Sequence, residues 1–141
     1  MEKRGFTLVE LLIVVALVLI LSALIVGVII SLVYQVQIAR TEAIILKLDT
    51  ACRTYRIEHA AYPPGNGSAR SLEAYLCAPR KAYLDGRLAS RSPYLEKAEF
   101  VDAWGHDIRY RSPGVRNGSG VDLWSPGRDG LDGGADDVAN W

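Results

Sequence analysis

Residues 5–15 of the chain read GFTLVELLIVV, and they place a single carboxylate, Glu10, at the start of a long apolar segment. No other formal charge follows until Arg40. An ionised side chain inside hydrocarbon costs about 3 kcal/mol on insertion scales. The sequence therefore predicts a partner that offsets this cost, and the identity of that partner decides how the chain is used.

The segment Leu11–Val33 is long enough to span a bilayer, because a spanning helix needs about 20 apolar residues. It contains only Leu, Ile, Val, Ala, Gly and Ser. Its apolar core is roughly twice as long as that of a secretory signal, so we expect it to stay with the protein. Lys3 and Arg4 precede the segment, and the positive-inside rule then places the N-terminus in the cytoplasm. We expect a single-pass membrane protein whose remaining chain is extracytoplasmic, which in a bacterium is the periplasm.

The formal net charge is zero, which argues against a general nucleic-acid binder. The charges are nevertheless uneven. Six basic and three acidic residues lie between Arg70 and Lys97, whereas five aspartates and only Arg128 lie between Val121 and Trp141. Two interpretations stay open: an ordinary solvated surface, or a dipolar subunit whose basic flank, including Arg80 and Lys81, meets the acidic flank of a neighbour.

The pattern of apolar residues predicts an α+β fold, in which a long N-terminal helix packs on a small antiparallel sheet. The helix runs from Leu11 to about Tyr62; its first half is apolar all round and its second half is amphipathic. Pro63 ends it, since a residue before proline avoids the helical region. Beyond the helix, the sequence predicts a loop at Asn66–Arg70, a short helix at Leu72–Cys77 with Ser71 as N-cap, an irregular stretch at Arg80–Ala98, and strands at Phe100–Val101, Ile108–Arg111 and Val121–Trp124.

Four aspartates crowd one glycine-rich stretch near the end of the chain: Asp129, Asp132, Asp136 and Asp137. Crowded carboxylates repel one another unless they are solvated or bridged by a cation, and calcium prefers such oxygen ligands. The spacing is neither that of an EF-hand nor that of a stacked glycine-aspartate repeat. Spacing alone leaves a calcium site and a plain acidic loop open.

The chain has two cysteines and two histidines. Cys52 on the long helix and Cys77 on the short one can form a disulfide in an oxidising periplasm, or can pack as buried free thiols. His59 and His106 have no companions at the spacing of a zinc site. A Ser-His-Asp site is compatible with the composition, but no nucleophile motif is present, so we expect no catalytic residues and no enzyme.

The stretch Lys3-Arg4-Gly5-Phe6-Thr7-Leu8-Val9-Glu10 resembles the class III leader of type IV pilins and type II secretion pseudopilins. The resemblance implies that a prepilin peptidase cuts after Gly5 and that the new N-terminal Phe6 is methylated. Phe6 and Glu10 lie four residues apart on one helical face. In a filament, Glu10 of one helix can then pair with the terminal ammonium of its neighbour and fix the register. The alternative is that Glu10 sits at headgroup depth.

The C-terminal part resembles the major pseudopilin family of type II secretion. Asp102–Tyr110 is similar to the family's Asp-Pro-Trp-Gly-Asn stretch, with Ala103 replacing proline, and Val121–Trp141 is similar to its last strand, turn and acidic loop. Gly27 stands where the family commonly has proline. The resemblance implies calcium, bound by the Asp129 and Asp136 side chains and the Pro126 carbonyl; further candidates are Asp132, Asp137 and the Leu131 carbonyl.

Together these features predict a leader at 1–5, a transmembrane and filament-core helix at 6–34, and a periplasmic pseudopilin domain at 35–141. The expected function is that of a structural subunit of the pseudopilus, a periplasmic helical filament that drives protein export across the outer membrane. The expected partners are further copies of the chain, other pseudopilins, the inner-membrane assembly platform, prepilin peptidase and membrane lipid, but not nucleic acid. The alternatives are a minor pseudopilin, a type IV pilin or, less favoured, a DNA-uptake pilin.

Overall fold

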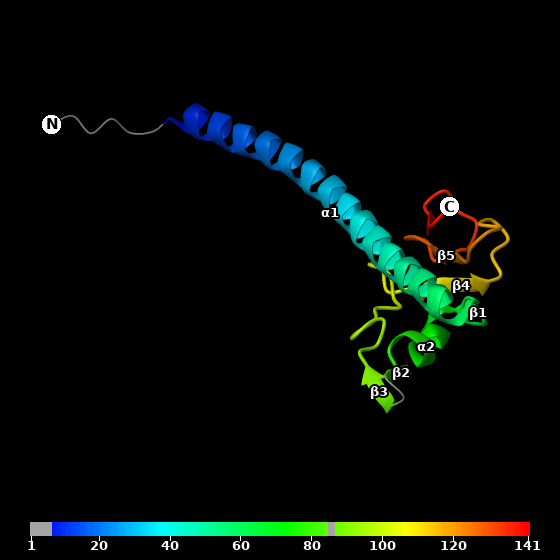
Figure 1. Ribbon diagram of the computed structural model, residues 1–141. Coiled ribbons are helices and arrows are strands. Elements are labelled where there is room, and N and C mark those ends of the chain that lie inside the picture. The colour runs from blue at the N-terminus through cyan, green and yellow to red at the C-terminus, as the bar shows by residue number, and fades with distance from the viewer. Residues whose placement is uncertain (1–6, 85–86) are drawn as a thin grey trace. The chain divides into compact units, whose positions relative to one another are not determined.

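The computed structural model describes residues 7–84 and 87–141, with side chains described for 7–79 and 92–141 (Figure 1). The chain divides into two compact units, residues 1–36 and residues 37–141. The first unit contains the beginning of helix α1, and the second contains the rest of α1 and every other element.

Helix α1 spans Leu8–His59 and is the dominant element of the chain. It starts three residues earlier and ends three residues earlier than the sequence predicted. Ala60 adopts a left-handed backbone conformation (φ 58°), which stops the helix before Pro63 and Pro64 are reached. By length and composition, α1 contains a stretch able to cross a membrane.

The second half of α1 buries one face in the core of residues 37–141. Its buried residues recur at spacings of three and four, as the sequence predicted: Thr41, Ile44, Ile45, Leu48, Asp49, Ala51 and Cys52. They pack against the sheet and the short helical segment, through Leu72, Leu76, Phe100, Ile108, Tyr110, Val121, Leu123 and Val138. The Tyr110 hydroxyl donates to the Pro63 carbonyl (2.6 Å) and so joins the sheet to the end of α1.

A four-stranded antiparallel sheet follows, with strand order β1-β4-β5-β6. This confirms the predicted α+β fold of a long helix and a small antiparallel sheet. The strands are β1 (Gly65–Ser68), β4 (Arg109–Ser112), β5 (Asp122–Ser125) and β6 (Val138–Ala139). The central strands β4 and β5 were predicted within one residue at each end. The edge strands β1 and β6 were not predicted. Strand β1 consists of glycine, asparagine and serine, which do not favour strands, and β6 has only two residues, too few for a strand pattern.

Several local predictions were wrong. The predicted strand Phe100–Val101 contains only an isolated bridge between Val101 and Asp107, and the predicted loop Asn66–Arg70 overlaps strand β1. Ser68, not Ser71, caps the short helical segment: Ser68 Oγ accepts from the Arg70 N–H (3.2 Å) at the start of η1 (Ala69–Leu72), which continues into α2 (Glu73–Leu76). The stretch predicted to be irregular contains a separate hairpin of β2 (Arg80–Leu84) and β3 (Arg87–Arg91). The sequence Asp85-Gly86 between these strands is a strong hairpin signal that outweighs their mixed polarity.

Candidate functional site

Glu10 closes a capping box at the start of α1. Its Oε2 accepts from the Thr7 N–H (3.1 Å) and the Thr7 hydroxyl (3.0 Å), and Thr7 Oγ1 accepts from the Glu10 N–H (3.3 Å). These bonds satisfy backbone donors that a helix start leaves unpaired. The Thr-x-x-Glu spacing is the signature of this role, which was not predicted. The predicted processing residues Gly5 and Phe6 lie outside the described residues.

The apolar N-terminal part of α1 is exposed to solvent. Every side chain from Leu8 to Val33 is exposed, and none of the apolar window is buried. Exposed apolar surface on this scale marks a site covered by lipid or protein. The segment therefore needs a partner that the isolated chain does not supply.

A second site is the C-terminal loop, residues 126–137, which joins β5 to β6. Its entry is fixed by a buried polar network: the Ser125 hydroxyl donates to Asp102 Oδ2 (2.6 Å), and Ser125 Oγ accepts from the Gly127 N–H (3.1 Å). His106 Nδ1 lies 2.9 Å from the Gly127 carbonyl oxygen. Pro126 is fully buried, and a side chain at Gly127 would collide with the Asp136 backbone. The loop is thus anchored where it leaves the sheet.

Three aspartates of the C-terminal loop each commit one oxygen to the loop backbone. Asp136 Oδ2 accepts from the N–H groups of Arg128 (2.8 Å) and Asp129 (3.1 Å). Asp129 Oδ1 accepts from the Leu131 N–H, and Asp137 Oδ2 from the Gly133 N–H, both at 2.8 Å. Hydrogen bonds from the backbone, that of Asp129 foremost, hold the pKa of Asp136 below its usual value.

The other oxygens of these aspartates converge beside Gly134. A Cβ added at Gly134 would lie 2.8 Å from Asp136 Oδ1, 3.5 Å from Asp129 Oδ2 and 3.6 Å from Asp137 Oδ1. Asp137 Oδ1 is buried and has no hydrogen-bond partner among the described residues. No group of three or more His, Cys, Asp or Glu in the described part of the chain is spaced as a ready-made metal site. A bound cation would therefore have to draw these oxygens closer together.

Asp132 is directed differently from its three neighbours. Its Oδ1 accepts from the Trp124 indole N–H (2.9 Å) and lies 3.5 Å from Arg109 Nε. Asp132 therefore ties the C-terminal loop to strands β4 and β5. Of the two aspartates among the further ligand candidates, the geometry favours Asp137 over Asp132.

Ser125, Asp102 and His106 do not form a catalytic triad. The serine hydroxyl is fully buried and donates directly to the aspartate, and His106 Nδ1 lies 3.6 Å from the same carboxylate oxygen. In a triad the histidine stands between serine and aspartate. The network is structural.

Asn140 connects the end of the chain to α1, a link that the sequence did not suggest. Its Nδ2 donates to Asp49 Oδ1 (3.1 Å) and to the Val121 carbonyl (2.9 Å), and its Oδ1 accepts from the Leu123 N–H (3.0 Å). Asp49 Oδ2 also accepts from Arg53 Nε (2.6 Å). No sequence signal could have shown this pairing, because its partners lie 91 residues apart.

Both cysteines are free thiols in the structure. Cys52 is fully buried in the core, and Cys77 is half-buried against it. Burial, assisted by the charge of Asp49, raises the pKa of Cys52 to about 12, so its thiol is a poor nucleophile at neutral pH. The disulfide alternative stays a prediction.

The basic flank is only partly within the described side chains, since those of Arg80 and Lys81 fall outside them. Arg70 is described, and it forms an ion pair with Asp107 of its own chain (2.8 Å). The Arg70 guanidinium, helped by the Ser68 hydroxyl, holds the pKa of Asp107 below its usual value. Arg70 is therefore partly neutralised within the subunit.

Comparisons with known proteins agree with both ends of the chain. A family model described as type II secretion system (T2SS), protein G, matches residues 29–141, and one described as the prokaryotic N-terminal methylation motif matches residues 1–26. The chain belongs to the type II secretion system protein G family. It is similar to the type II secretion system core protein G of Pseudomonas aeruginosa (32% identity over 99% of this chain and 96% of that protein) and of Escherichia coli K12 (29% identity over 99% and 92%).

The fold of this pseudopilin is also that of a solved relative. The crystal structure of the major pseudopilin from the type 2 secretion system of enterohaemorrhagic Escherichia coli matches with a TM-score of 0.54 and 24% identity, covering 76% of this chain and 88% of that chain. The predicted family is confirmed. The alternatives of a minor pseudopilin, a type IV pilin and a DNA-uptake pilin are not favoured.

Proposed function

We propose that this pseudopilin is anchored in the inner membrane by the beginning of α1, is cut after Gly5, and then enters the pseudopilus through that same helix. As a member of its family, the chain is a structural subunit of the secretion pseudopilus and not an enzyme. The observation that carries the proposal is the complete exposure of the apolar stretch Leu8–Val33. Lipid covers this surface before assembly, and the helices of further pseudopilins cover it afterwards.

Glu10 gives the assembly its register. Among the described residues of the single subunit, Thr7 engages Oε2 alone of the two carboxylate oxygens, and Glu10 is exposed. Cleavage after Gly5 creates an ammonium on Phe6, four residues before Glu10. The Phe6 ammonium of a neighbouring subunit can pair with the Glu10 carboxylate when both groups are buried in the filament. Each charge is then neutralised only after the two subunits have assembled.

Two variants separate the register role of Glu10 from its capping role. Glu10→Ala removes the charge and half of the capping box, whereas Thr7→Ala removes the other half and keeps the charge. We expect Glu10→Ala to be processed, as mass spectrometry of the purified full chain shows, but to yield few filaments. Thr7→Ala should be processed and should assemble. Normal filaments from Glu10→Ala would contradict the register role.

The C-terminal loop is proposed to bind calcium. Asp129, Asp136 and Asp137 would hold the ion, assisted by the Pro126 carbonyl, because each carboxylate has one oxygen that the loop backbone does not use. Asp137 Oδ1, which is buried and has no hydrogen-bond partner within residues 7–79 and 92–141, supports this assignment. Calcium takes six to eight oxygen ligands in flexible geometry and supplies positive charge that offsets carboxylate repulsion. Its role here is to order a glycine-rich segment, not to take part in a reaction.

Calcium removal tests this proposal. A ligand that binds only the folded state adds about 2.7 kcal/mol to the free energy of unfolding at 100 times its Kd. We expect the full chain in detergent to melt at a higher temperature with calcium than with chelator, and Asp136→Ala to abolish the difference. Equal melting of the wild-type chain in the two conditions would overturn the calcium assignment and leave the filament function intact.

A further inference from the structure

The loop between β4 and β5, residues 113–121, is held by backbone hydrogen bonds to one side chain although its tip is exposed. Buried Asp122 holds it: Oδ2 accepts from the N–H groups of Val115 (2.7 Å) and Arg116 (3.1 Å), and Oδ1 from that of Asn117 (2.8 Å). Yet Val115 is 71% exposed, and Arg116 is exposed beside it. A loop fixed by a buried carboxylate that presents an apolar side chain to solvent has the character of a preformed contact element.

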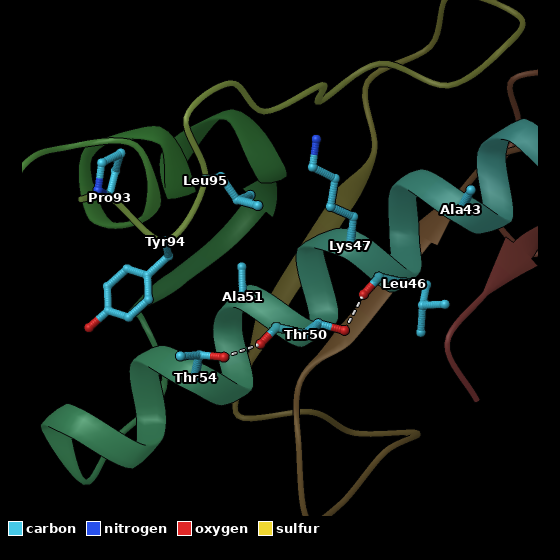
Figure 2. A pocket seen from close by; sticks show the side chains of 9 residues that line it. All are labelled: Ala43, Leu46, Lys47, Thr50, Ala51, Thr54, Pro93, Tyr94 and Leu95. Carbon is cyan, nitrogen blue, oxygen red and sulfur yellow. Dashed lines mark hydrogen bonds between the residues drawn. The ribbon is translucent and has the colours of Figure 1, made fainter.

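A groove lies on the second half of α1, where the segment Pro93–Leu95 runs alongside the helix (Figure 2). Its volume is about 510 Å³. The Tyr94 hydroxyl donates to Glu58 Oε2 (2.6 Å), which fixes that wall against α1. The lining is mostly apolar or small: Ala43, Leu46, Lys47, Thr50, Ala51, Thr54, Pro93, Tyr94 and Leu95.

An exposed carboxylate, Glu42, lies one helical turn from the edge of the groove. Leu46 at its edge is 66% exposed. Glu42 lies four residues before Leu46, on the same side of the helix, and is exposed. Within the described residues the Glu42 carboxylate makes no hydrogen bond or ion pair, and neither does the Arg116 guanidinium on the β4–β5 loop. Each subunit therefore presents two complementary surfaces. One is the apolar Val115 beside the Arg116 guanidinium, and the other is the apolar groove near the Glu42 carboxylate.

The loop of one copy cannot fill the groove of the same copy. Arg56 Nη1 donates to the Ser119 carbonyl (3.2 Å) and holds the β4–β5 loop against one side of α1. Thr54, two residues earlier, lines the groove. At 3.6 residues per turn, the side chains at positions 54 and 56 leave the helix about 160° apart. The groove wall at Thr54 and the loop contact at Arg56 thus lie on opposite sides of α1. Glu42 is separated from Arg56 by 14 residues, about 21 Å along the helix axis, so we infer that the loop reaches the groove and Glu42 of another molecule.

We propose that the β4–β5 loop of one copy docks into the α1 groove of a second copy, with Val115 against Leu46 and Tyr94 and with Arg116 paired to Glu42. The proposal rests on the filament function of the family. A tip and a complementary groove at different places on one chain make a head-to-tail contact, which repeats along an open assembly instead of closing into a dimer. The contact needs no ordering of the loop, because Asp122 has already fixed it.

A charge exchange tests the pairing in filaments of the full chain. Arg116→Glu and Glu42→Arg each place like charges across the contact, and we expect each to lower the yield of filaments per processed subunit about five-fold, the effect of about 1 kcal/mol. The double variant restores the attraction and should return the yield to near that of the wild type. Glu73→Arg, an exposed reversal on α2 away from the groove, is the matched control and should assemble normally.

Crosslinking then identifies the occupant. In a chain whose native cysteines are replaced, Val115→Cys with Leu46→Cys should give ladders of covalent multimers on mild oxidation of filaments, and either cysteine alone should not. Full yield from both single reversals, no rescue in the double variant, no ladder, or crosslinks to a different pseudopilin would each overturn the docking. If wild-type subunits formed no filaments at all, the proposed function itself would fail.

Discussion

Two glycine-rich loops flank β5: the β4–β5 loop before it and the C-terminal loop after it. In both loops, aspartate side chains accept hydrogen bonds from the loop backbone. In the β4–β5 loop, Asp122 directs both oxygens at backbone N–H groups and is fully used. In the C-terminal loop, Asp129, Asp136 and Asp137 each use one oxygen, and the other three face a common space beside Gly134. The first loop supplies a backbone donor to both oxygens of its carboxylate, whereas the second leaves one oxygen of each of three carboxylates without a backbone donor. This difference is the strongest structural reason to expect a cation in one loop and not in the other.

The largest effect should come from breaking the β4–β5 loop. Asp122→Ala leaves three N–H groups without their acceptor, and we expect it to lower the free energy of unfolding by about 3 kcal/mol. Denaturant unfolding of the full chain in detergent measures this. The affinity for calcium should stay within two-fold of the wild type, roughly the experimental scatter, if the two loops are independent. A matching loss of calcium affinity would show that they are not.

The pH dependence of the stability lost in Asp122→Ala tests the role of the Asp122 charge. Burial acts to raise the pKa of Asp122, but the N–H groups of Asn117, Arg116 and Val115 outweigh it, and the net pKa lies below the ordinary 3.8. The stabilisation is therefore fully present above pH 3.8 and is lost as the pH falls through the lower, folded-state value. Wild type and Asp122→Ala should differ by a constant amount at pH 5–7 and converge in acid. A gap that stayed constant to the lowest measurable pH would show that the charge of Asp122 contributes nothing.

A smaller effect should separate the ligands within the C-terminal loop. Asp137→Ala removes the buried oxygen that has no hydrogen-bond partner in the described part of the chain, and we expect calcium to bind about ten-fold more weakly, equivalent to about 1.4 kcal/mol. Calorimetric titration of calcium into the full chain measures the affinity. An unchanged affinity would remove Asp137 from the ligand set.

The smallest effect should come from Asp132→Ala. Asp132 is half-exposed and is bonded to Trp124, so we expect a loss of stability of about 0.5 kcal/mol and little change in calcium affinity. The tryptophan fluorescence should shift, since the indole N–H loses its acceptor. A ten-fold loss of calcium affinity would instead restore Asp132 as a ligand.

Much of this architecture follows from local patterns in the sequence. The lone Glu10 before an apolar run, the period of Ile44, Leu48 and Cys52, and Pro63 after α1 were sufficient to predict the long helix and its buried face. The hairpin β2–β3 also had a local signal, Asp85-Gly86, which was overlooked. Such features depend on neighbours a few residues away, so spacing alone reveals them.

Other features depend on residues that only the folded chain brings together. Strand β1 exists because β4 pairs with it, not because Gly65–Ser68 favours a strand. The bond between Asn140 and Asp49 joins the end of the chain to α1. The different roles of Asp132 and Asp137 depend on the reach of the Trp124 side chain across the sheet. The composition located the acidic loop, but it could not show which of its aspartates are the better candidates for calcium ligands.

Hydrogen exchange of the full chain in detergent, with calcium and with chelator, tests the difference between the two loops most directly. We expect chelation to raise the exchange of residues 126–137, because three carboxylates then repel one another, and to leave residues 113–121 unchanged, because Asp122 holds that loop without a cation. Identical exchange of residues 126–137 in the two conditions would contradict the account, as would equal loosening of both loops.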